Sequence, residues 1–500
     1  MHAASLVDAA AALGATCSHP TVSVRCVRID TMPDRLSALD ASLLYMEDRS
    51  TPMHVGGVAV FERPDVGFDF ELMCKLINHR LGYLPRYRQR VMRVPGHLAR
   101  PVWADDVDFD LNYHVRRSAL PAPGTDDQLF ELVARLLARP LDQGRPLWEA
   151  YFVEGLAGDR VALVTKTHQA LVDGIGTIEL GQLILDPAPG ELDPVDDEMW
   201  LPGKTPSKAE LMFDAVAETV QQPTMLVESA KAAAGDAAAT AVKLADAVGG
   251  VASAMRAALK PAPSSPLNVE VSGGRVFAGV RTTLDDYRQI RATHGGTVND
   301  IVLAAITGAL REWLLSRKVP LDQTSTVRAL VPLAVADAST RSYSSAGIVG
   351  NEVAAYLVDL PVGETDPVMR LQHISHAMAS HVDSGRSVAA QTLLRVGGFA
   401  PPTLHSLGAR TAGTFSNRIF NVIVTNSPGP QIPMFAAHAK MVEMFPIMPL
   451  VRNHALAIGV TSYYGGVYFG LNGDRKAVSD IDVIAAMVHE SLAELKGTTR

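Results

Sequence analysis

The chain has 500 residues, with 45 Lys and Arg against 53 Asp and Glu, so its formal net charge is −8; 47% of its residues are hydrophobic and 20% are charged. This composition excludes a disordered chain and predicts a large buried core, and a domain size of about 100–200 residues predicts two or three domains. Because acids are in excess, no global basic field attracts nucleic acid, and we expect no nucleic-acid partner.

The number of cysteines and the hydropathy of the chain indicate in which cellular compartment to expect the protein. Cys17, Cys26 and Cys74 form neither a disulfide framework nor a CxxC metal pair, which favours a reducing environment. The N-terminal residues lack the basic region of a signal peptide, and no apolar run reaches the ~18 residues of a membrane span. We therefore expect a cytoplasmic protein, soluble or peripheral, and the scattered histidines predict no metal site.

Residues 160–168 alternate with a period of two, which predicts a strand. Gly174 and a helical pattern through Ile175, Ile178 and Leu185 follow, so residues 168–174 are expected at the carboxyl end of that strand. Residues 205–266 are rich in alanine and contain several Pro and Gly residues. A helical connector is the simpler interpretation of that stretch, and an amphipathic segment that touches lipid or another subunit is the alternative.

After residue 266 an α/β pattern returns. Thr297 or Asn299 can cap a helix whose apolar face is Val302, Ile306, Leu310, Trp313 and Leu314. Strands are predicted at Val327–Leu333, Val353–Leu360 and Ile419–Thr425, and a hairpin at Leu456–Tyr463 and Val467–Leu471.

A set of short motifs occurs in a fixed order along the chain. The segment Lys166–Gly174 contains His168, Asp173 and Gly174 in an arrangement that resembles the HHxxxDG signature of CoA-dependent acyltransferases. The other motifs are Leu36–Glu47, Thr51–Gly56, Pro85–Arg88, Phe109–Val115, Pro140–Asp142, Arg145–Glu149, Gly296–Ala304, Gly350–Asn351, Leu360–Pro361, Asp366–Pro367 and Asn426–Pro430. Together they resemble the bacterial wax ester synthase/diacylglycerol acyltransferase family, from about Met32 to about residue 490.

This resemblance implies an α/β, two-domain fold of the chloramphenicol-acetyltransferase type, with a tunnel at the domain interface. Acyl-CoA would enter as a substrate opposite the acceptor alcohol, and no cofactor is implied. A histidine would take the proton of the acceptor hydroxyl as that hydroxyl attacks the thioester, and a positioned donor would stabilise the oxyanion. Asp173 would anchor the loop rather than carry protons, and Gly174 would allow the backbone to approach closely.

The sequence departs from the family pattern at Gln169, which occupies the position of the second histidine, the presumed base. A carboxamide has no useful proton affinity near neutral pH, so Gln169 cannot act as a general base. His168 is either a structural histidine or a base that has taken over the role, although adjacent side chains of a strand point to opposite faces. The family also usually has an arginine where Ala336 stands.

Four further residues match the family near the site. Asn299 can supply an amide to the oxyanion, and Asn299 and Asp300 can equally be helix-capping residues. Asn426 and Ser427 precede a Pro-Gly-Pro turn, where they either line the substrate site or only form the turn.

We therefore expect an acyl-CoA-dependent O-acyltransferase that makes triacylglycerol from diacylglycerol, or wax ester from a long-chain alcohol. The alternative is a weakened or inactive member that binds acyl lipid or acyl-CoA. Lipid substrates also lead us to expect peripheral attachment to a membrane or lipid droplet. The expected organisation is an N-terminal extension (1–31), with Met32 close to the native start, an N-terminal acyltransferase domain (32–204), the connector (205–266) and a C-terminal acyltransferase domain (267–500).

Overall fold

The computed structural model describes residues 34–172, 181, 184–190, 200–221, 261–334, 353–383 and 419–499. Residues 1–31, residues 175–180 of the helix expected after Gly174, most of the alanine-rich connector, Asp173, Gly174 and Ala336 lie outside these residues. Leu185, expected in that helix, is described and is not helical. Residues 34–500 form one compact unit by their contacts.

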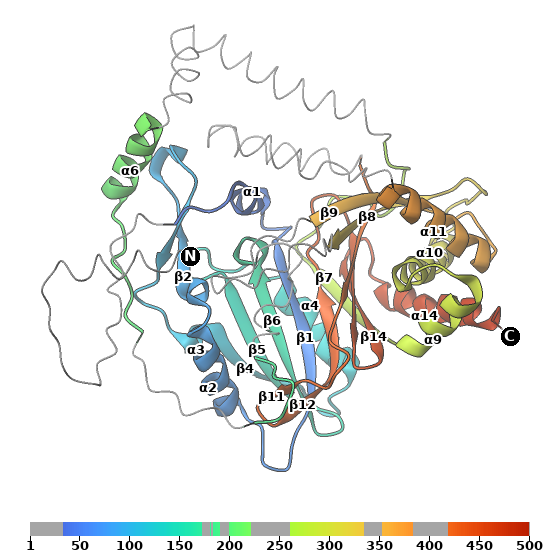
Figure 1. Ribbon diagram of the computed structural model, residues 1–500, viewed down its shortest axis with the longest axis horizontal. Helices are drawn as coiled ribbons and strands as arrows, with labels where there is room; N and C mark the ends of the chain where they lie inside the picture. Colours follow the sequence, from blue (N-terminus) through green and yellow to red (C-terminus); the bar gives the residue numbers. More distant parts are fainter. Residues whose placement is uncertain are drawn as a thin grey trace, which may run out of the picture. The chain divides into compact units, whose positions relative to one another are not determined.

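Two six-stranded sheets organise this unit (Figure 1). The first has the order β11-β12-β1-β6-β5-β4, and the second has the order β7-β14-β13-β10-β8-β9. The strands of the first sheet are β1 (His54–Glu62), β4 (Val115–Ala119), β5 (Trp148–Leu156), β6 (Arg160–His168), β11 (Phe435–Ala436) and β12 (Ala439–Ile447). Those of the second are β7 (Arg275–Thr283), β8 (Val327–Ala334), β9 (Val353–Leu360), β10 (Val422–Pro428), β13 (Leu456–Tyr463) and β14 (Gly466–Asp474).

Helices from each half pack on these sheets and bury two large apolar cores. The first core includes residues of α1 (Ala38–Met46), α2 (Phe70–Leu81) and α4 (Asp126–Leu137). The second includes residues of α9 (Leu284–His294), α10 (Val298–Ser316), α11 (Pro367–Asp383) and α14 (Ile481–Gly497). The remaining elements are η2 (Pro85–Arg88), β2 (Gln89–Met92), η3 (Pro95–His97), β3 (Val102–Asp105), α3 (Leu111–His114), η4 (Gln169–Leu171) and α6 (Lys208–Gln221).

The local elements agree closely with those predicted. Strand β6 ends at His168, β9 has the predicted bounds, and β13 and β14 form the predicted hairpin. Thr297 caps α10 in a capping box with Asp300, and the predicted apolar face of that helix is buried. Strand β10 begins at Val422 rather than Ile419, because the Asn421 side chain accepts a hydrogen bond from the Arg328 backbone N–H (2.7 Å) and fixes the turn before the strand.

One feature of the sheets was not predicted. Strand β12 belongs to the second half of the chain but pairs antiparallel with β1 in the first sheet, from Gly56 opposite Ile447 to Phe61 opposite Met441. The other neighbour of β1 is β6, which carries the acyltransferase-like motif. The second half therefore completes the sheet that positions His168.

Candidate functional site

The motif begins where β6 ends. The His168 backbone N–H donates to the Leu147 carbonyl (2.9 Å), and the Gln169 N–H donates to the Met53 carbonyl (2.8 Å). His168 is still extended, whereas Gln169 opens the short 3₁₀ turn η4. The two residues are thus held by backbone bonds to segments on both sides of the strand.

The His168 side chain is fully buried, and its ring nitrogens are oriented by two neighbours. Its Nδ1 accepts a hydrogen bond from the Ala170 backbone N–H (2.9 Å), so the proton of the neutral ring is on Nε2. That Nε2 lies 3.6 Å from Oε2 of Glu47. Since a general base needs a free lone pair facing its substrate, this geometry favours the structural interpretation of His168 over a base role.

Gln169, in contrast, is only half-buried. Lys166 and His168 are two positions apart on β6, point to the same face and are buried, whereas Gln169 lies beyond the end of the strand. Position 169, where the family has its presumed base, is therefore more exposed than position 168. In this chain the carboxamide of Gln169 occupies it.

A buried polar cluster lies behind the motif. Glu47 has Oε1 at 3.7 Å from Nε2 of His54, and its Oε2 accepts a hydrogen bond from the Gln143 amide (2.6 Å). His54 lies directly opposite His168 in the β1–β6 register, and its Nε2 accepts from the Leu141 backbone N–H (3.3 Å). Burial, helped by the charges of Lys166 and Arg275 and by His168, holds the pKa of His54 well below its usual 6.5, so this ring is neutral.

Sequence reasoning missed this cluster. In the sequence, Glu47 is only the last residue of one motif, and His54 is one of several scattered histidines without the spacing of a metal site. The signal was in the strand pattern, because pairing β1 with β6 places His54 across from His168. Among the described residues, no group of three or more His, Cys, Asp or Glu side chains is arranged to hold a metal ion.

A second location involves the two predicted asparagines. The Asn426 amide donates to Oδ1 of Asn299 (3.2 Å), so the structure joins residues of β10 and α10. Asp300 is a capping residue, since its carboxylate accepts from the Thr297 N–H (2.8 Å) and the Ser375 hydroxyl (3.1 Å). The Ser427 carbonyl accepts from the Thr461 hydroxyl (2.8 Å). Within the described part of the chain, no hydrogen bond joins this asparagine pair to Gln169.

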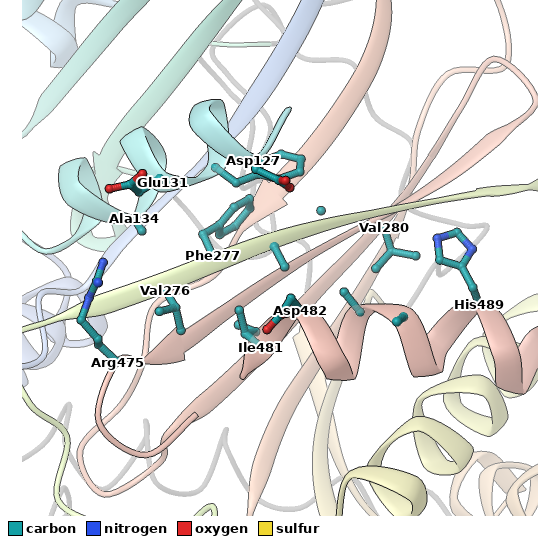
Figure 2. Close-up of a pocket in the computed structure, with 15 residues that line it drawn as sticks. Asp127, Glu131, Ala134, Val276, Phe277, Val280, Arg475, Ile481, Asp482 and His489 are labelled. Atoms are coloured by element: carbon teal, nitrogen blue, oxygen red, sulfur yellow. The ribbon is translucent and has the colours of Figure 1, made fainter. Parts of the chain in front are cut away.

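An open groove of about 470 Å³ lies between α4, β7 and α14 (Figure 2). Its floor includes Phe277 and Val280, and carboxylates line both sides, with Glu131 from α4 and Asp482 from α14 (Figure 2). His489 also lines it, and burial together with Arg281 lowers the pKa of its imidazole. Excess carboxylate repels the phosphates of CoA, and none of the predicted site residues lines this groove.

Two comparisons with solved structures define the class of protein. The fold matches the first condensation domain of the calcium-dependent antibiotic synthetase (TM-score 0.53, 13% identity, 93% of this chain and 97% of that chain), which supports the fold alone. It also matches the wax ester synthase/diacylglycerol acyltransferase from Marinobacter aquaeolei VT8 (TM-score 0.67, 26% identity, 93% and 99%). The predicted two-domain acyltransferase fold is therefore confirmed.

The sequence comparisons identify the family. Residues 36–302 match the wax ester synthase/diacylglycerol acyltransferase catalytic domain, and residues 349–496 match the WS/DGAT C-terminal domain. Two relatives from Mycobacterium tuberculosis H37Rv are the probable diacylglycerol O-acyltransferases tgs3 (44% identity over 53% of this chain and 97% of the relative) and tgs2 (34% identity over 93% and 99%). The chain belongs to the wax ester synthase/diacylglycerol acyltransferase family, a family of acyltransferase enzymes.

Proposed function

We propose that this protein transfers a long-chain acyl group from acyl-CoA to the free hydroxyl of diacylglycerol, giving triacylglycerol and CoA. A long-chain alcohol is the second acceptor, and its product is a wax ester. The observation that carries the proposal is the match to both family domains, which spans nearly the whole chain and both sheets. Relatives named as diacylglycerol O-acyltransferases favour diacylglycerol as the main acceptor.

The reaction is a direct transfer between two bound substrates. The acceptor oxygen attacks the thioester carbonyl, the carbon–sulfur bond breaks, and the hydroxyl proton ends on the sulfur of CoA. The amide of Asn299, held by Asn426, is the donor that we assign to the oxyanion. Asp173 and Gly174 belong to the motif that resembles the family signature, and we assign Asp173 to anchoring rather than to proton transfer. The role of these residues in catalysis is part of the proposal.

Gln169 sets the rate of this reaction. It cannot accept the hydroxyl proton, and the free lone pair of His168 is already bonded to Ala170. A general base contributes about 10²–10⁴-fold in rate, so the chain keeps the contributions of positioning and oxyanion stabilisation but runs slowly. The second candidate function, binding acyl-CoA or acyl lipid with negligible turnover, is favoured by the same residue.

The test is acyl transfer by the purified full chain, with oleoyl-CoA and dioleoylglycerol as substrates and triacylglycerol measured by mass spectrometry. We expect slow turnover for the wild type and an increase of about 10²-fold or more for Gln169→His, because a base returns to the open position. Gln289→His, on the exposed surface of α9, is the matched control. If the wild type binds oleoyl-CoA but makes no product while Gln169→His does, the binding function replaces the enzymatic one.

The substrates also imply where the protein acts. Diacylglycerol and triacylglycerol reside in membranes and lipid droplets, so we propose that the protein works peripherally at a lipid surface. In the described part of the chain no helix is long and apolar enough to cross a bilayer.

A further inference from the structure

Positive charge is concentrated in one segment of this acidic chain. Residues 72–104 contain no Asp or Glu, although the chain as a whole has a net charge of −8. The structure places this segment at the end of α2 and through η2, β2 and η3. Its cations are Lys75, Arg80, Arg86, Arg88, Arg90, Arg93 and Arg100.

Acids from elsewhere neutralise only part of this charge. Arg80 pairs with Asp186, and Arg86 pairs with Asp34. Arg93 is exposed and donates to the neutral amide oxygen of Gln143 (2.6 Å). The segment therefore keeps a positive surface in the folded protein.

Large apolar side chains are exposed next to this segment. Leu201 is 77% exposed and Phe213 of α6 is 75% exposed, and Met212 and Val216 of the same helix are also exposed. Leu98, within the basic segment, is exposed as well. Over residues 208–217, where its side chains are described, helix α6 buries Leu211 and Ala215 and exposes Met212, Phe213 and Val216, so its apolar face is wider than the part that packs on the protein.

The basic segment and helix α6, which carries most of these apolar side chains, are packed against each other. Ala215 of α6 packs in a small cluster with Val94 and Ala99, which are the chain neighbours of Arg93, Leu98 and Arg100. Upstream of α6, the Trp200 ring lies 5.4 Å from the Arg88 guanidinium. Figure 1 shows α6 beside β2. We call the surface formed by Arg93, Leu98, Arg100, Leu201, Met212, Phe213 and Val216 the basic–apolar face.

We infer that the basic–apolar face docks on the surface of an anionic phospholipid bilayer. Exposed Phe and Leu side chains insert at the level of the headgroups, and arginines bind the lipid phosphates around them. A second copy of this chain is a poor occupant, because its own arginines would face those of the first copy. This inference goes beyond the acyl transfer proposed above, and its test does not depend on turnover.

The experiment measures binding of the full chain to vesicles of phosphatidylcholine with and without phosphatidylglycerol, by flotation. We expect binding to the anionic vesicles that weakens at high salt and that falls by about tenfold or more in Leu201→Ser/Phe213→Ser and in Arg93→Gln/Arg100→Gln. The matched controls are Val66→Ser/Ile432→Ser for exposed apolar groups and Arg291→Gln/Lys476→Gln for exposed cations. Since these side chains are exposed, apart from the half-buried Arg100, each variant should keep the melting temperature of the wild type.

Three results would overturn the inference. In the first, the wild type floats equally with neutral and anionic vesicles. In the second, the control pairs lose as much binding as the pairs on the basic–apolar face. In the third, the wild type is a dimer in size-exclusion chromatography and Leu201→Ser/Phe213→Ser converts it to a monomer, which would assign the face to a second copy.

Discussion

Glu47 is the residue that connects the motif to the rest of the first half. Its carboxylate accepts from Gln143 and faces both His54 and His168, all of them behind the open position of Gln169. Because Gln143 also accepts from the surface residue Arg93, a chain of polar contacts runs from Arg93 to His168. Because this buried carboxylate contacts residues of the motif and its neighbours, we regard Glu47 as a positioning residue.

Glu47→Ala should lower both stability and activity. It removes the acceptor of the Gln143 amide, and a hydrogen bond to a charged group of this kind contributes about 1–3 kcal/mol of unfolding free energy. We expect a lower kcat with little change in KM, and a partial recovery in Glu47→Gln, which keeps an oxygen in place. Urea unfolding and steady-state kinetics measure these effects. Glu62→Ala, at the exposed end of β1, is the control, and equal losses in both alanine variants would contradict the positioning role.

Three buried histidines make stability depend on pH. Burial lowers the pKa of His54, His114 and His454 below the usual 6.5, while the unfolded chain takes up protons near that value. The unfolded state therefore binds more protons, so this stability is fully present above about pH 6.5 and is lost as pH falls toward the folded pKa values. Each group contributes a slope of about 1.4 kcal/mol per pH unit in that window.

His114→Phe isolates one of these groups. The His114 ring is stacked on Phe109 and Trp148, so a phenyl ring keeps the packing but cannot titrate. We expect the unfolding free energy to depend less on pH between about pH 5 and pH 6.5. The slope should fall by about 1.4 kcal/mol per pH unit, which corresponds to one proton fewer taken up on unfolding. Urea unfolding at several pH values measures it. His373→Asn, at an exposed site on α11, should leave the slope unchanged, and an unchanged slope in His114→Phe would refute the assignment.

At the scale of elements, strands β12 and β14 pack so closely that position 470 of β14 must be glycine. A Cβ built on Gly470 of β14 would lie 1.8 Å from the Pro446 carbonyl oxygen of β12, a contact that the backbone must move to relieve. Overpacking of this kind costs about 1–3 kcal/mol or more, so Gly470→Ala should lower the urea midpoint clearly. Gly273→Ala, where a Cβ meets nothing within 4 Å, is the matched control. Equal midpoints for the two variants would show that the strands separate without cost.

Local patterns predicted single elements well and their long-range pairing poorly. The period of two in residues 160–168 and the apolar face of α10 depend on neighbours in the chain, so β6 and α10 were predictable. The pairing of β12 with β1 joins segments almost 400 residues apart, as in Gly56 opposite Ile447, and nothing local encodes it. For the site, the resemblance indicated Asn299 and Asn426, but their contact joins residues that are far apart in the chain, as does that of Glu47 with His168, so no local pattern encodes either.

At the scale of the whole molecule, the two halves share a sheet and a core. Phe130 of α4 packs against Phe277 of β7 and Phe445 of β12. Arg281 of β7 pairs with Asp126 of α4 (2.8 Å), and Arg275 donates to the Ser50 carbonyl of the first half. Because of these contacts, each half buries side chains of the other and depends on it for a complete core.

A fragment of residues 34–221 should therefore not fold on its own. Without β12, the edge of β1 loses its antiparallel partner from Gly56 to Phe61, and the apolar side chains that cover α4 and the first sheet are missing. We expect the fragment to lack near-UV circular dichroism and a cooperative thermal transition, whereas co-expression with residues 261–500 should give a soluble complex with both. The full chain should unfold in one transition, reported alike by tryptophans of the two cores, Trp148 and Trp313, in single-tryptophan variants. A sharp transition in the isolated fragment would instead make the first sheet a domain in its own right, with β12 as an accessory strand.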